Sequence, residues 1–152
     1  MDLVAVREIE QLKYRYTRAL DLKQWDEFAA TLTADVSASY GAKLSFRGRH
    51  DVVTFMRNSL GPAIITVHHV HHPEITISGD EATGTWYLQD TVIITEHRML
   101  LRGAAFYTDR YVRTDGGWQI AATAYTRSYE SVEKLDESWQ LTANRFAEQV
   151  PS

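Results

Sequence analysis

The sequence predicts an α+β domain, in which a curved antiparallel sheet forms a cone or half-barrel and three N-terminal helices enclose a pocket against it. Two observations carry this prediction. Apolar residues in the first 60 positions recur at steps of three and four, and from Ala63 onward they alternate with a period of two. Because the helices precede the long strands, they should cover one face of the sheet.

Three segments have helical spacing. The first, about 20 residues long, has the apolar stripe Leu3, Val6, Ile9, Leu12, Tyr16 and Leu20. The second begins near Gln24 and has the stripe Trp25, Phe28, Ala29 and Leu32. The third covers residues 49–60 and ends at Gly61-Pro62.

The strand pattern is strongest in the second half of the chain. A short pair is predicted at 37–40 and 44–46, and four long strands at 63–78, 82–95, 99–113 and 117–130. The turns SGDE and TDGG are rich in the Gly and Asp of tight hairpins, so consecutive antiparallel pairing is expected. Residues 132–152 are predicted to form a C-terminal helical tail of a single domain, 1–152.

Composition narrows the function classes. The 152 residues contain no cysteine, which excludes thiol nucleophiles and thiolate metal sites. A net charge of -4 without a basic cluster argues against a nucleic-acid partner. The N-terminus lacks an unbroken apolar stretch, and no apolar run approaches the ~20 residues of a membrane span. We therefore expect a cytoplasmic protein with no membrane partner.

Four histidines lie in the stretch VHHVHHP at residues 67–73. Strand alternation places His68 and His72 on one face and His69 and His71 on the other. Metal ligands must converge, so we expect no metal site. A single histidine can instead act as a general base near neutral pH if a carboxylate fixes its tautomer, and the others are then strand or surface residues.

Three carboxylates are candidate partners for such a histidine, namely Asp21, Asp90 and Asp109. Asp21 lies near the end of the first helix, where the helix dipole disfavours a carboxylate, so either another group holds it there or it is a solvated helix end. Tyr16 is about 140° from Asp21 around an ideal helix, so the two can line one pocket only from its two flanks.

The last long strand has polar side chains on one face, which is either solvated or turned toward the pocket. Thr123, Tyr125 and Arg127 share that face. The residues expected to line the pocket and bind substrate are Tyr107, Tyr125, Trp86, Phe55 and Thr123.

The order of motifs along residues 5–131 resembles the SnoaL-like branch of the nuclear-transport-factor-2 superfamily, which is also called cystatin-like. The motifs are YxxxxD (Tyr16 and Asp21), KQWDEF, FRGRHDVVTFM, TVHHVHHPEI, GTWYL, AAFYTDRYVRTDGGWQI and TAYTRSYE. Similar enzymes of this superfamily are bile-acid dehydratase, scytalone dehydratase and lindane dehydrochlorinase. They eliminate water or HCl from cyclic substrates without a metal or organic cofactor.

The resemblance implies a role for four residues. His68 corresponds to the base that removes a substrate proton, with His69 as its rival if the register slips by one residue. Asp21 orients the base, Tyr16 donates to a substrate oxygen, and Arg127 holds an oxyanion or a carboxylate. Scytalone dehydratase has a second tyrosine and a second histidine, for which Tyr107, Tyr125 and His97 are candidates.

We therefore expect a cofactor-independent lyase that dehydrates a hydrophobic cyclic molecule such as a steroid or polyketide. An isomerase or cyclase would use the same base. A non-catalytic ligand-binding or assembly domain of the same fold is the alternative from another class. The superfamily resemblance also implies a homo-oligomer, either a dimer or a trimer.

Overall fold

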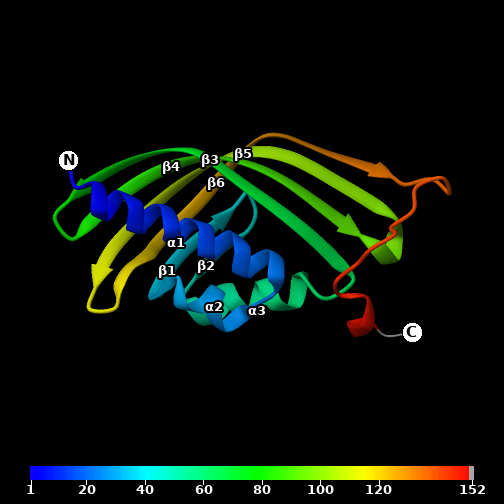
Figure 1. Ribbon diagram of the computed structural model, residues 1–152, viewed down its shortest axis with the longest axis horizontal. Helices are drawn as coiled ribbons and strands as arrows, with labels where there is room; N and C mark the ends of the chain where they lie inside the picture. Colours follow the sequence, from blue (N-terminus) through cyan, green and yellow to red (C-terminus); the bar gives the residue numbers. More distant parts are fainter. Residues whose placement is uncertain (151–152) are drawn as a thin grey trace.

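The computed structural model describes residues 1–150, and it has two layers: a curved sheet arches over three helices (Figure 1). The helices are α1 (Leu3–Leu22), α2 (Trp25–Ala30) and α3 (Arg49–Ser59). The strands are β1 (Leu32–Tyr40), β2 (Ser45–Arg47), β3 (Ile64–Ser78), β4 (Glu81–Ile94), β5 (Met99–Thr114) and β6 (Gly117–Lys134), with short 3-10 turns η1 (Thr95–His97) and η2 (Ala147–Gln149). The predicted fold class is confirmed.

The six strands are ordered β2-β1-β6-β5-β4-β3. Strands β3 to β6 pair consecutively and antiparallel, as predicted, whereas β1 pairs parallel with β6. Leu32 begins β1 instead of ending the helical stripe of α2, so β1 is longer than predicted. Because β1 joins the sheet beside β6, strand β3, which carries the histidines, remains at the opposite edge of the sheet.

The C-terminal segment corrects the prediction of a helical tail. Residues 132–134 continue β6, because Val132 still pairs with Leu101 of β5. After Lys134 the chain follows an irregular path to η2. Its buried apolar side chains are Leu135 and Phe146, which are too far apart in sequence to form a helical stripe.

Helix α1 is fixed at both ends. The Asp2 carboxylate accepts a hydrogen bond from the Ala5 amide at 3.0 Å, and Lys23 ends the helix in the left-handed conformation at φ 58°. The Gln24 amide then donates to the Ala19 carbonyl at 2.8 Å. Within residues 1–150, none of the helices combines the length and the apolar character that a bilayer crossing requires.

A buried ion pair joins α1 to the sheet. Lys13 Nζ lies 2.7 Å from Asp109 Oδ2, and both side chains are fully buried. The Tyr111 and Thr123 hydroxyls donate to the same carboxylate at 2.8 and 2.7 Å, and the Tyr107 ring lies 3.4 Å from the ammonium. Burial lowers the pKa of Lys13, and Asp109 opposes that shift. Each charge is therefore compensated mainly by the other.

A bulge in β3 shows that the predicted alternation of the histidines is wrong at His72. The register with β4 shifts between residues 71 and 74, and His72 has a φ of 49°. The His72 ring packs edge-on against exposed Tyr87, with ring centroids 5.5 Å apart. His72 therefore does not share a face with His68. Pro73 has no N–H to give to the ladder, which favours a bulge at this point of an edge strand.

Asp109→Asn should lower the free energy of unfolding by about 3–5 kcal/mol, because it leaves the Lys13 ammonium buried without a counter-charge. The double variant Lys13→Met/Asp109→Asn should recover most of that loss, since an uncharged pair has no ion to desolvate. Urea unfolding of the wild type and both variants measures the difference. Equal losses in the single and the double variant would contradict the ion-pair account.

Candidate functional site

Asp21 and His68 form the centre of the candidate site. His68 Nδ1 lies 2.6 Å from Asp21 Oδ1, and the His68 backbone N–H donates to Asp21 Oδ2 at 2.8 Å. The side chains are only 12% and 20% exposed, so the contact is partly shielded from water. The carboxylate thus holds both the ring and the backbone of the same residue, which fixes the ring's orientation.

Thr66 completes the set of donors to Asp21. Its hydroxyl donates to Asp21 Oδ1 at 2.8 Å, and Thr66 is 4% exposed. Asp21 lies in the last turn of α1, where the helix dipole disfavours a carboxylate. Hydrogen bonds to a charged group are worth more than those between neutral groups, so these donors offset that cost. Sequence reasoning missed Thr66, although alternation already placed it on the face of His68.

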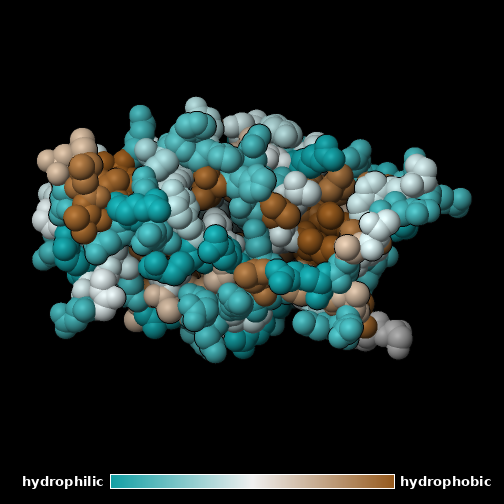
Figure 2. All heavy atoms as spheres, in the orientation of Figure 1, coloured by the Kyte–Doolittle hydropathy of each residue, from teal (hydrophilic) through white to brown (hydrophobic). Residues whose placement is uncertain are grey.

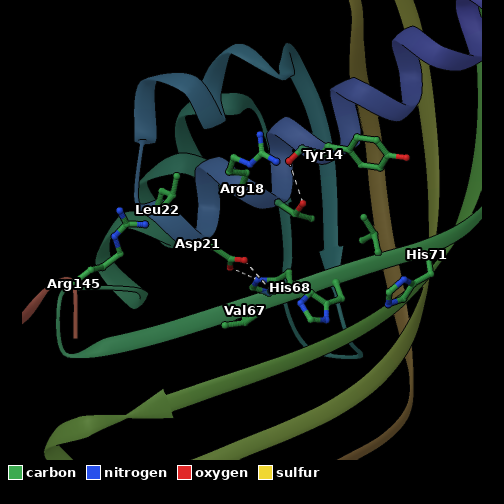
Figure 3. A pocket seen from close by; sticks show the side chains of 11 residues that line it. Tyr14, Arg18, Asp21, Leu22, Val67, His68, His71 and Arg145 are labelled. Carbon is green, nitrogen blue, oxygen red and sulfur yellow. Dashed lines mark hydrogen bonds and ion pairs between the residues drawn. The ribbon is translucent and has the colours of Figure 1, made fainter. Parts of the chain in front are cut away.

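A groove of about 560 Å³ runs along the seam between α1 and β3, and His68 lies in its wall (Figure 3). Helix α1 supplies Tyr14, Thr17, Arg18, Asp21 and Leu22, strand β3 supplies Val67, His68, His69, Val70 and His71, and the C-terminal segment supplies Arg145. In the orientation of Figure 1, apolar side chains also gather in a hollow between the sheet and the helices, close to the C-terminal segment (Figure 2).

The register leaves His68, and not His69, beside Asp21. His69 is exposed, and its ring lies 6.0 Å from that of His71 on the opposite face of β3. No hydrogen bond from residues 1–150 reaches His68 Nε2. When the Nδ1 proton is donated to Asp21, the Nε2 lone pair of the neutral ring is therefore the free proton acceptor.

Arg127 lies on the inner face of the sheet and is held by Asp90. The guanidinium forms a fork with the carboxylate, with Nη1 and Nη2 at 2.5 and 2.8 Å from its oxygens. These hydrogen bonds raise the pKa of Arg127. Gly103 lets the side chain pass over β5, since a Cβ there would lie 2.3 Å from Arg127 Nη1.

Asp90 also pairs with His68 across β3 and β4. The His68 N–H points off the sheet edge toward Asp21, so the two residues form a non-hydrogen-bonded pair, in which side chains approach closely. The inner face therefore carries a row of polar side chains from Asp21 through His68 and Asp90 to Arg127. Of the three candidate carboxylates, Asp21 contacts His68, Asp90 contacts Arg127 and Asp109 contacts Lys13.

Tyr16 does not line the groove of His68. Its side chain is fully buried on the core side of α1, and its hydroxyl lies 2.7 Å from that of Tyr40. Burial raises the pKa of Tyr16 well above its ordinary value, so the hydroxyl keeps its proton. The angular separation from Asp21 around α1 persists in the structure and keeps the two side chains in different surroundings.

The five residues expected to bind substrate also lie away from this groove. Trp86, Tyr107 and Thr123 are buried in the core. Phe55 packs on Phe46 with ring centroids 4.5 Å apart, and Tyr125 packs on Tyr107 at 5.6 Å. The helices fill this part of the concave face, which alternation alone could not reveal. His97 is exposed in η1.

Two of the groove residues that sequence reasoning missed are Arg18 and Arg145. Arg18 lies one helical turn before Asp21, and this spacing could have placed it on the same face. Arg145 comes from the irregular C-terminal segment, for which the sequence offers no periodic signal. Among residues 1–150, no group of three or more His, Asp or Glu side chains is arranged to hold a metal ion.

The protein is an α+β domain in which helices cover one face of a curved sheet. Asp21 and His68 are paired where α1 meets β3. The chain belongs to the SnoaL-like domain family, whose sequence profile matches residues 1–124. The motif order predicts this membership, and the nuclear-transport-factor-2-like superfamily is confirmed with it. Arg145 and the rest of the C-terminal segment lie beyond the matched residues.

Several solved structures share this fold. A candidate scytalone dehydratase from Novosphingobium aromaticivorans has a TM-score of 0.79 at 22% identity, over 94% of this chain and 93% of that chain. A hexachlorocyclohexane dehydrochlorinase from Novosphingobium barchaimii has a TM-score of 0.77 at 19% identity, over 86% of this chain and 91% of that chain. At such identities the likeness shows the fold, which is one that dehydratases and dehydrochlorinases use.

Relatives by sequence include an uncharacterized protein of Mycobacterium tuberculosis. It is 24% identical over 127 residues, which cover 82% of this chain and 86% of the relative. This match assigns no activity.

Neutral His68 should carry its proton on Nδ1, because the Asp21 carboxylate accepts it there. Nitrogen NMR of the imidazole at mildly alkaline pH distinguishes the two tautomers. Asp21→Ala should abolish the Nδ1–H form, whereas Thr66→Val should retain it, since Thr66 donates to Asp21 and not to the ring. A wild-type His68 protonated on Nε2 would contradict the geometry.

Gly103→Ala should destabilise the protein by about 1–3 kcal/mol, because the new methyl group overlaps the Arg127 guanidinium and forces it off Asp90. Gly61→Ala is the matched control, since no atom lies within 4 Å of a Cβ there. Urea unfolding measures both variants. A Gly103→Ala protein as stable as the Gly61→Ala protein would show that the fork does not need the glycine.

Proposed function

We propose that the protein is a cofactor-independent lyase, which eliminates water from a hydrophobic cyclic molecule such as a steroid or polyketide. The observation that carries this proposal is the contact between Asp21 and His68 Nδ1 at 2.6 Å, which leaves Nε2 of a groove-lining imidazole without a partner from residues 1–150. An imidazole in this arrangement is a general base whose ring is held in place before the substrate arrives.

The reaction begins at a carbon next to a carbonyl group. His68 Nε2 takes the proton from that carbon, and the electrons of the broken C–H bond form the new carbon–carbon double bond. The C–O bond to the neighbouring carbon breaks, and the hydroxide that leaves takes the proton back from the imidazolium to become water. Asp21 stabilises the imidazolium between these two steps, because its negative charge lies against Nδ1.

The proton source in this scheme is His68 and not Tyr16. The Tyr16 hydroxyl contacts Tyr40 in the core and does not line the groove. The Asp90–Arg127 pair acts from the sheet side, where its carboxylate is a close neighbour of His68. There it adds a fixed, nearly neutral polar group beside the base.

The groove suits a substrate with an apolar body. Tyr14, Leu22, Val67 and Val70 contribute apolar surface around the polar centre, and apolar walls with a few placed polar groups are typical of small-molecule sites. An isomerase would use the same proton abstraction and return the proton to another carbon. The oriented imidazole favours either reaction over a binding module, because ligand storage needs no base held by a carboxylate.

His68→Gln should reduce turnover roughly 10²–10⁴-fold, the contribution that a positioned general base makes. Asp21→Asn should also lower the rate strongly, since it removes the negative charge that stabilises the imidazolium. The assay follows cyclic β-hydroxyketones in deuterated water by NMR, which detects both the alkene product and deuterium uptake beside the carbonyl.

His97→Gln is the matched control, because His97 lies in the exposed turn η1. It should retain wild-type rates. Urea unfolding of each variant separates a lost base from a lost fold. Wild-type turnover in a folded His68→Gln protein would refute the proposal, whereas deuterium uptake without elimination would favour the isomerase.

A further inference from the structure

The groove of His68 has an excess of positive groups, although the whole protein has a net charge of -4. Its walls include two arginines, Arg18 and Arg145. Asp21 is the one carboxylate in that lining, and its oxygens already accept from Thr66 and His68. The groove therefore has cationic donors in surplus.

Neither groove arginine is paired with another side chain of residues 1–150. Within residues 1–150, Arg18 and Arg145 form no ion pair with any carboxylate and no side-chain hydrogen bond. Both are exposed. Arg127 differs in this respect, because both of its Nη atoms donate to the Asp90 carboxylate. A guanidinium keeps its charge at any physiological pH, so the two free forks remain available to an anion.

The two arginines come from different elements that converge on the groove. Arg18 projects from α1 one turn before Asp21, and Arg145 comes from the C-terminal segment beyond Leu22 (Figure 3). The segment is anchored next to Arg145, since Phe146 is 6% exposed and its ring lies 4.7 Å from Lys23 Nζ. Lys23 in turn donates to the Ile64 carbonyl at 2.7 Å.

This anchoring fixes the backbone that carries Arg145 relative to the reacting base. Lys23 follows α1 directly and Ile64 begins β3, so the segment is tied to the two elements that hold Asp21 and His68. An anionic group between the arginines would thus have a defined position with respect to His68 Nε2. Such positioning of a remote substrate group is a common way to align the reacting carbon with the base.

We propose that the substrate is an anion, with a carboxylate or phosphate group that Arg18 and Arg145 bind while its apolar ring system lies along the groove toward His68. This inference rests on the proposed function for the role of His68. The planar guanidinium fork matches the oxygens of a carboxylate or a phosphate in a bidentate manner, which sets the anion apart from an uncharged analogue.

The test compares three probes that share one ring system: 1-naphthylacetate, 1-naphthyl phosphate and the uncharged 1-naphthylacetamide. Calorimetric titration of the wild type should show at least one anion binding roughly tenfold more tightly than the amide, the size expected for hydrogen bonds to a charged group. The tighter of the two anions identifies the group. Added salt should weaken anion binding and leave amide binding unchanged.

The double variant Arg18→Gln/Arg145→Gln should lose the preference for the anion and still bind the amide. Arg110→Gln is the matched control, because Arg110 is an exposed arginine on β5 outside the groove. It should keep the preference. The inference is overturned if the wild type fails to prefer an anion, including the case in which no probe binds, or if the double variant keeps the preference.

His68→Gln separates this inference from the proposed function. It should reduce turnover roughly 10²–10⁴-fold and retain the anion preference, since it leaves both arginines in place. A folded His68→Gln protein with full turnover and an intact anion preference would refute the lyase and not the anion site. The opposite result, loss of turnover in His68→Gln with no anion preference in the wild type, would refute the anion site alone.

Discussion

The carboxylate of Asp21 is the interaction on which the rest of the site depends, because it holds the end of α1 against the edge of the sheet. An edge strand has N–H groups without strand partners, and a carboxylate at a helix C-terminus is disfavoured by the dipole. The hydrogen bonds from Thr66 and His68 resolve both problems at once. They also fix the register of β3 under α1, since a slip of one residue would turn a different side chain toward the carboxylate.

Local periodicity is enough to predict the layers of the fold. Helical spacing and strand alternation arise because apolar side chains of each element face a shared core. The structure contains such a core between the helices and the sheet. The pairing of Asp21 with His68 follows from the family resemblance and is present in the structure, whereas the spacing of the residues alone leaves three carboxylates open. Alternation failed at His72, where a positive φ and the neighbouring Pro73 add a residue to the strand. A backbone torsion of this kind leaves no trace in a pattern of apolar and polar residues.

Other features depend on partners that are distant in sequence. Lys13 is a polar residue on the buried side of α1, and only Asp109 explains why it can be there. The parallel contact between β1 and β6 and the course of the C-terminal segment also arise from long-range packing. Tyr16 shows the limit of a family resemblance. The motif implies that Tyr16 donates to a substrate oxygen, yet the structure places its hydroxyl against Tyr40 and outside the groove of His68.

Arg127 differs from Arg18 and Arg145 in how far its charge is compensated by a nearby carboxylate. An oxyanion that replaced Asp90 in the fork with Arg127 would leave a carboxylate whose side chain is 4% exposed without its partner. A buried carboxylate left without its partner costs several kcal/mol, so that exchange is unfavourable. The charge of Arg127 is therefore largely compensated by Asp90 beside His68. Asp90 and Arg127, behind His68, compensate each other, whereas Arg18 on α1 and Arg145 on the C-terminal segment have no counter-charge among residues 1–150. A substrate anion would then be held away from the reacting carbon, where it does not compete with Asp21 for the imidazolium.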